Sequence, residues 1–221
     1  TLRRVSAGWS HLSTVSREAE AWLAQRAGLE LFGDALALCT QEDLAIVRGP
    51  SEAEPTDSFE WLHVTMPSNW APIDKIGRSF VTAHAPVVHS ERLQAAAPQI
   101  VRAMIQGGPF TRYVWGIHRD GAFCHNPRLH HQPAWVSDAG ADLVKQAYFR
   151  VERQTTCGFP TLNRALFTIR YWTIPLTEVI SEPWRRERLT TALAAMDEAE
   201  LAYKGLTEVR DPLVAYLSVP E

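Results

Sequence analysis

The chain has 221 residues, and 46% of them are hydrophobic, which is enough to bury a sizeable core. No uninterrupted apolar run approaches the length that crosses a bilayer, so we expect no membrane segment. The 22 basic and 25 acidic residues are interspersed and nearly cancel, which argues against the positively charged surface typical of nucleic-acid-binding proteins.

Cysteine usage narrows the class further. Cys39, Cys124 and Cys157 form no CxxC pair. This spacing argues against a structural zinc, a [2Fe-2S] cluster, a disulfide framework and a covalently attached c-type haem. The chain begins at Thr1 without an apolar leader, so we expect no export. The predicted location is a reducing cytoplasm.

The N-terminal part predicts one helix followed by paired strands. Residues 15–27 are rich in alanine, glutamate and leucine and are followed by Gly28, which is typical of a helix and its end. Two short apolar and aromatic runs, residues 36–49 and 58–66, flank the proline-containing turn SEAEPTD. This arrangement indicates two paired strands.

The next segment predicts an amphipathic helix that ends in a buried histidine. Pro72 suits the first turn of a helix, and Pro86 stops the run. Between them, apolar spacing of three or four residues connects Ile73, Ile76, Phe80 and His84. A histidine on an apolar helix face can hold a flat iron cofactor. A lone histidine in this position is more often a hydrogen-bonded core residue, so the spacing alone leaves both interpretations open.

Helix and strand patterns continue to the C-terminus. A helix is predicted over residues 90–106, with Ser90 as its cap and Gly107-Gly108-Pro109 as its stop. Three strands follow, because β-branched and aromatic residues dominate residues 110–118, 146–156 and 164–176. From residue 182 to about 217 the pattern is helical again.

The order of these elements predicts the fold class. Two strands, a helical middle and three further strands are the order of a PAS-type fold. We therefore predict an α+β protein with a PAS-like five-stranded antiparallel sheet, helices on one face, and N- and C-terminal helical extensions. Residues 1–221 are expected to form a single domain, with its core at about 36–176. The His84 helix would then cover the sheet, with a ligand slot between them.

Five motifs in this order resemble the haem-binding subunit of haem-dependent oxidative N-demethylases. They are LHVTMPSNWAPIDKIGRSFVTAHAPV, VWGIHRDGAFCHNP, RVERQT, ALFTIRYW and LAYKGL, and they run from about Trp61 to Gly205. The resemblance implies a PAS scaffold in which haem b activates dioxygen and a small secondary amine is oxidised to a smaller amine and an aldehyde. It also implies that His84 is the proximal iron ligand. Val114 departs from the family's asparagine, so the resemblance leaves the particular amine open.

The strand around RVERQT carries the residues that we expect to act on substrate. Alternation places Arg150 and Glu152 on one face and Arg153 on the other. A guanidinium, from Arg150 or Arg153, would stabilise charge that develops on oxygen, and the Glu152 carboxylate would hold the amine and accept its proton. The alternative is a cross-strand ion pair with Arg170, or a solvated sheet face.

Haem contacts outside the His84 helix are predicted for a basic loop and one tryptophan. His118, Arg119 and Arg128 are candidates for pairing with the haem carboxylates, because imidazole and guanidinium groups suit them. The alternative for this loop is a solvated surface connection. Trp115 is a candidate for packing on the macrocycle, although core packing is the commoner role of a tryptophan. A Cys157 thiolate ligand is a weaker option than His84.

The sequence also predicts that electrons come from another protein. No GxGxxG or P-loop motif occurs, and the cysteines cannot hold a four-thiolate cluster. The resemblance agrees, since it implies separate flavin, iron-sulfur and folate-handling subunits that would carry electrons from NADPH.

Three function classes follow from the sequence. The leading one is a haem-dependent monooxygenase of the N-demethylase type with O2 as co-substrate. The second is a haem-based PAS gas or redox sensor, although no kinase, cyclase or DNA-binding output segment is present. The third is a PAS-like binder without iron, in which His84 is a core residue.

Overall fold

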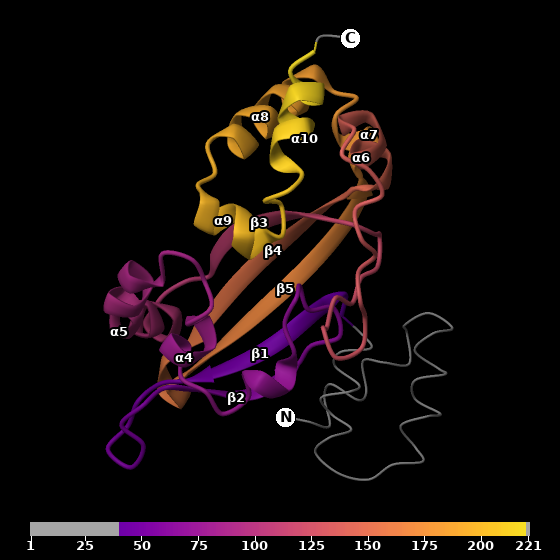
Figure 1. Cartoon of the computed structure of the whole chain (residues 1–221). Helices are drawn as coiled ribbons and strands as arrows, with labels where there is room; N and C mark the ends of the chain where they lie inside the picture. The colour runs from indigo at the N-terminus through magenta and orange to yellow at the C-terminus, as the bar shows by residue number, and fades with distance from the viewer. Residues whose placement is uncertain (1–39, 220–221) are drawn as a thin grey trace, which may run out of the picture.

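A five-stranded antiparallel sheet forms the centre of the fold, in the spatial order β2-β1-β5-β4-β3 (Figure 1). The computed structural model describes residues 40–219, so the helix predicted over residues 15–27 lies outside the described residues. The strands are β1 (Glu42–Arg48), β2 (Ser58–His63), β3 (Phe110–His118), β4 (Tyr148–Phe159) and β5 (Arg164–Pro175). The predicted α+β class with a PAS-like sheet is confirmed.

The strand register decides which side chains share a face. Glu152 on β4 lies opposite Val114 on β3 and Tyr171 on β5. Because directly opposite residues point to the same side of a sheet, these three share one face. Arg153 lies opposite Tyr113 and belongs to the other face, as the alternation in β4 predicts.

Two helices, α4 (Phe80–His84) and α5 (Ser90–Gln106), cover the face that carries Glu152. Phe80 of α4 and Val101 of α5 are buried against Val47 and Ala165 of the sheet. Burial of apolar side chains of this size contributes about 1.5–3 kcal/mol each. Helices on one face of the sheet are therefore confirmed, and this packing fixes α4 over the strands.

The single helix predicted from Pro72 to His84 is wrong. The segment begins with a 3-10 turn, Pro72–Asp74, and only restarts as a helix at Phe80. Gly77 adopts a left-handed backbone with φ +73°, which a continuing α-helix does not allow. Its N–H donates to the Phe59 carbonyl at 2.8 Å, so strand β2 takes the backbone group that the helix would have used. As a consequence, Ile73 is 64% exposed instead of buried.

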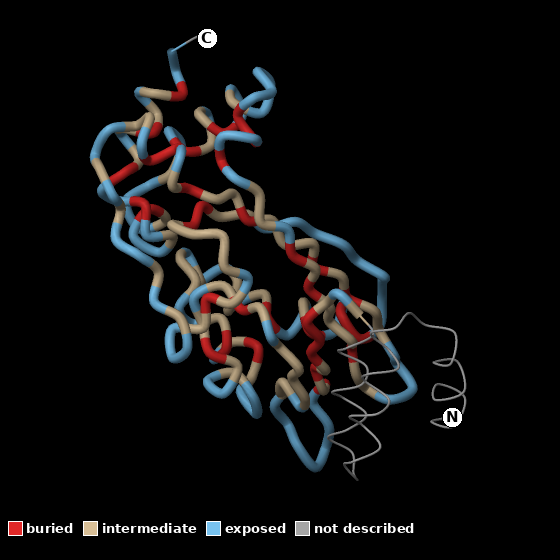
Figure 2. The backbone as a smooth tube through the Cα atoms, turned by 90° about the vertical axis from the view of Figure 1, so that its right-hand side faces the viewer, coloured by how far each residue is buried: buried red, intermediate tan, exposed pale blue. Residues whose placement is uncertain are grey.

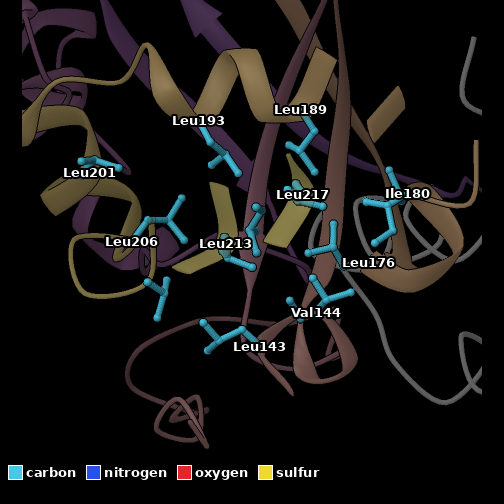
Figure 3. Packing of buried hydrophobic residues seen from close by; sticks show 14 residues of the cluster. Leu143, Val144, Leu176, Ile180, Leu189, Leu193, Leu201, Leu206, Leu213 and Leu217 are labelled. Atoms are coloured by element: carbon cyan, nitrogen blue, oxygen red, sulfur yellow. The ribbon is translucent and has the colours of Figure 1, made fainter. Parts of the chain in front are cut away.

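The C-terminal helices form a second core at one end of the sheet (Figure 1). They are α7 (Leu176–Val179), α8 (Pro183–Ala194), α9 (Glu198–Lys204) and α10 (Arg210–Leu217), joined by α6 (Gly140–Gln146), which precedes β4. The short helices α6 and α7 were not predicted, whereas the extension from residue 182 is confirmed. Figure 3 shows leucines from α6, α8, α9 and α10 pointing toward one another, and Leu143, Leu193 and Leu213 are fully buried.

The distribution of buried and exposed residues reflects the two hydrophobic cores, one under α4 and α5 and one among the C-terminal helices. In Figure 2 the buried segments run along the strands and the C-terminal helices, and the connecting loops are largely exposed. Within residues 40–219, no helix has both the length and the apolar character needed to cross a bilayer.

Candidate functional site

His84 ends helix α4, and its ring orientation is set by its own helix. Its Nδ1 lies 2.8 Å from the Phe80 carbonyl oxygen, and the two rings stack with centroids 4.2 Å apart. A carbonyl can only accept, so Nδ1 carries the hydrogen and Nε2 carries the lone pair. No residue that the structure describes forms a hydrogen bond with Nε2. Burial lowers the pKa of His84, which favours the neutral imidazole that binds metals.

Glu152 lies on the same side of the sheet as His84 and is held by two hydrogen bonds. Ser68 donates its hydroxyl to Oε1 at 2.6 Å, and Gln154 donates its amide to Oε2 at 2.8 Å. Ser68 belongs to the loop between β2 and α4, so this contact fixes the loop to the sheet. Each carboxylate oxygen can accept further hydrogen bonds, so Glu152 keeps capacity for a bound cation or N–H group.

Arg150 lies beside Glu152 and is almost completely buried. Its Nε is 3.7 Å from Glu152 Oε1, and its terminal nitrogens donate to the Phe123 carbonyl at 2.7 Å and to the Met66 carbonyl. Its guanidinium also lies 4.2 Å from the centre of the Tyr171 ring. Burial lowers the pKa of Arg150, although the nearby acidic groups oppose this effect. Arg150 therefore fastens two loops to the sheet and compensates the Glu152 charge.

A polar chain leads from Glu152 toward His84. Gln154, which binds Glu152, also accepts a hydrogen bond from Arg112 Nε at 2.7 Å. The Arg112 charge contributes to the lowered pKa of His84, and so does Lys75, which donates to the Ala83 carbonyl in α4. The two groups of the site are thus connected through Gln154 and Arg112 on the sheet.

Helix α9 lies against strand β3 at the edge of the sheet, next to the site. Lys204 donates to the Trp115 carbonyl on β3 at 2.9 Å, which fixes α9 to the edge of the sheet. The neighbouring Tyr203 is 52% exposed, and its pKa is raised by burial and by the charge of Glu152. A cavity of about 470 Å³ lies between β3 and helices α8 and α9, and Val114 is among its lining residues, whereas His84 is not.

Two predicted site residues, Arg153 and Trp115, lie on the opposite face of the sheet. Arg153 pairs with Glu42 at 3.3 Å, and Arg170 lies 3.9 Å from the same carboxylate. This is the ion-pair arrangement that the sequence left as an alternative. The Trp115 ring stacks on Phe149 with centroids 5.5 Å apart and packs against the C-terminal helices.

The basic loop residues are also separated from His84. His118 is buried, and its ring is parallel to that of His125 at 4.4 Å; burial lowers its pKa to about 3. Arg119 contacts the Pro133 carbonyl at 3.4 Å, and Arg128 is an exposed partner of Asp74.

The structure therefore places His84, Arg150 and Glu152 on one side of the sheet. His118 shares this face but lies at the end of β3 beside His125, and the remaining predicted residues lie outside the group. Sequence reasoning missed Ser68, Arg112 and Tyr203. Arg112 had a detectable signal, because alternation along residues 110–118 places it on the same face as Val114. Ser68 lies within the first of the five motifs, but no spacing connects it with Glu152, which is 84 residues away.

Comparison with known protein families finds a match over most of the chain. A family model described as haem-dependent oxidative N-demethylase, alpha subunit-like, matches residues 18–214, which include every residue of the site. The description indicates a haem-dependent oxidoreductase that works with a partner subunit, and it gives no support to a haem-based sensor. The chain belongs to the haem-dependent oxidative N-demethylase, alpha subunit-like family.

Proposed function

We propose that this protein binds haem b through His84 and oxidises a small secondary amine with O2. The electrons would come from NADPH through a flavin and iron-sulfur partner. The observation that carries the proposal is the His84 imidazole, which is neutral, is oriented by the Phe80 carbonyl, and has its Nε2 free of partners among the described residues. Metal-bound histidines usually have their second nitrogen fixed in this way.

The residues near His84 fit a flat, largely apolar cofactor with charged edges. Phe80 and Phe59 lie beside the imidazole, with ring centroids 4.2 Å and 6.2 Å from it. Val114 is 38% exposed on the same face of the sheet. Arg112 offers guanidinium N–H groups that suit a haem carboxylate. The chemistry that a bound haem supplies is the reductive activation of dioxygen.

In this proposal, Glu152 binds the amine and accepts its proton. A secondary amine is mostly protonated near neutral pH, and its nitrogen lone pair is then occupied. A carboxylate attracts the ammonium ion and takes the proton, which frees the lone pair for oxidation. Ser68 and Gln154 hold the two oxygens of Glu152 at 2.6 Å and 2.8 Å, so the carboxylate has a fixed direction.

The two arginines on this face would have different roles. Arg150 uses its terminal nitrogens to bind two backbone carbonyls, so we assign it to positioning Glu152 rather than to contact with oxygen. Arg112 uses only Nε for Gln154, and its remaining N–H groups form no hydrogen bond with the described residues. We therefore assign Arg112 to binding a haem carboxylate. Arg153 lies on the other face and has no part in the proposal.

The overall reaction balances with one dioxygen. A secondary N-methylamine, O2, two electrons and two protons give a primary amine, formaldehyde and water. The test combines an absorption spectrum with product analysis. Purified protein reconstituted with haem should show a Soret band that shifts on titration with a panel of secondary N-methylamines. After chemical reduction and addition of O2, it should form formaldehyde. Absence of a Soret band after reconstitution would support the iron-free binder instead.

A further inference from the structure

A second group of chemically reactive side chains lies in the loop of residues 119–139, between β3 and α6. His125 Nε2 is 2.9 Å from one oxygen of Asp120, and His130 Nε2 is 2.9 Å from the other. One donor atom from each residue lies within 4.8 Å of the other two. None of these residues contributes to the proposed amine oxidation.

Hydrogen bonding alone leaves this cluster incompletely satisfied. Both histidines present Nε2 to Asp120, so a neutral ring leaves Nδ1 as an acceptor. His125 is only 1% exposed, and its Nδ1 is buried with no partner among residues 40–219. The Nδ1 of His118, whose ring is parallel to that of His125 at 4.4 Å, is also buried with no partner in that part of the chain. A cation would be bound through the two Nε2 atoms that face Asp120, and the buried Nδ1 atoms would remain outside its coordination.

We propose that Asp120, His125 and His130 bind one divalent transition cation, with zinc as the best fit. Two imidazole nitrogens and one carboxylate are a common zinc donor set, with room for a water molecule as a further ligand. Oxygen-preferring cations such as Mg²⁺ and Ca²⁺ suit these donors less well. Tetrahedral zinc at about 2.1 Å from each donor separates the donors by about 3.4 Å. The two 2.9 Å contacts run to different oxygens of Asp120, so one imidazole would turn toward the oxygen that the other contacts, and all three donor atoms already lie within 4.8 Å of one another.

The position of the cluster indicates a structural role for the cation. The same loop provides the Phe123 carbonyl that accepts from Arg150, and the His125 backbone N–H donates to the Pro67 carbonyl at 2.9 Å. Pro67 directly precedes Ser68, which binds Glu152. A cation at Asp120 would therefore hold the loop that positions both Arg150 and Ser68, without touching the substrate.

Metal content of the full chain tests the proposal. The protein is stripped with a chelator, loaded with zinc, desalted and analysed for zinc by mass spectrometry, with cobalt binding followed by visible absorption. The variant is His130→Ala, and the matched control is His131→Ala, because His131 is the exposed neighbour outside the cluster. We expect about one zinc per chain in the wild type and in the control, and at least a roughly 10-fold weaker affinity in His130→Ala.

A second variant keeps the test decisive. Asp120→Asn retains the size of the side chain and loses the charged ligand, so it covers the case in which His130→Ala does not fold. Equal zinc binding by the variants and the control, or no zinc in the wild type, overturns the proposal. Haem content is measured separately from the Soret band, so a failure of the haem proposal and a failure of the zinc proposal give different results.

Discussion

The Nδ1 hydrogen of His84 is donated to the Phe80 carbonyl four residues earlier in the same helix, at 2.8 Å. One turn of α4 therefore orients the imidazole that we propose as the iron ligand. The carbonyl selects the tautomer that leaves Nε2 available, and it adds electron density to the ring. Phe80 is itself buried in the core between α4, α5 and the sheet, so the ligand geometry depends on that core.

Replacing His84 with alanine should abolish haem binding. The variant loses the only iron ligand that we propose from this chain, whereas the helix keeps its Ser79 cap and its Phe80 anchor. The measurement is the Soret absorbance per chain after reconstitution and desalting. His89→Ala is the matched control, because His89 is an exposed histidine five residues later whose Nε2 pairs with Asp197. Equal haem retention in both variants would contradict the ligand assignment.

Replacing Glu152 with glutamine should preserve haem and remove amine oxidation. The amide has the same shape, but it does not attract an ammonium ion or accept its proton at neutral pH. Loss of a general base reduces rates by about 10²–10⁴-fold, so we expect at least a 100-fold lower yield of formaldehyde per unit time. Glu60→Gln is the control, because Glu60 pairs with Arg164 at 2.7 Å on the far strand β2. Unchanged turnover in Glu152→Gln would assign the proton transfer to another group.

Arg150 and Arg153 are three residues apart in β4 and should respond very differently to replacement by methionine. Arg150 is 1% exposed and binds two loop carbonyls, so its loss leaves those carbonyls and Glu152 without their partner. We expect the free energy of unfolding in urea to fall by about 3–5 kcal/mol. Arg153 is 40% exposed and pairs with Glu42, so Arg153→Met should cost less than about 1 kcal/mol. Similar losses in the two variants would contradict the positioning role of Arg150.

The parts of the fold that the sequence predicted well are those with local causes. Strand β3 has the predicted limits, because its β-branched and aromatic run is bounded by Pro109 on one side and Asp120 with Gly121 on the other. Helix α5 has the predicted range, which ends before Gly107. The segment from Pro72 to His84 was mispredicted because backbone pairing of Gly77 with Phe59 overrides the apolar spacing. The spacing of the apolar residues gives no indication of this hydrogen bond.

The residues of the site also fall into those that local sequence predicted and those that depend on tertiary contacts. His84 and Glu152 could be proposed from helix spacing, strand alternation and motif resemblance. The groups that orient Glu152 and Arg150 come from loops, and these depend on tertiary structure. Met66 and Ser68 are both 84 residues from the side chains that they bind. Trp115 and Arg119 belong to the motif VWGIHRDGAFCHNP, but strand alternation and the direction of the following loop take them away from His84.

The last prediction tests whether α9 and Glu152 face the same slot, and it needs no haem. Burial raises the pKa of Tyr203, and the negative charge of Glu152 raises it further, since a nearby carboxylate disfavours the tyrosinate. Glu152→Gln removes the negative charge and leaves the burial of Tyr203 unchanged. The pKa of Tyr203 should therefore fall but stay above the ordinary value of about 10.

Titration of ¹³C-tyrosine-labelled, haem-free protein by NMR measures this shift, with Tyr203→Phe identifying the signal. Glu60→Gln should leave the pKa of Tyr203 unchanged, because Glu60 lies on strand β2 at the other edge of the sheet. If the Tyr203 signal titrates identically in Glu152→Gln and in the wild type, the charge of Glu152 does not reach α9. Helix α9 would then not border the proposed slot, whatever the haem content of the protein.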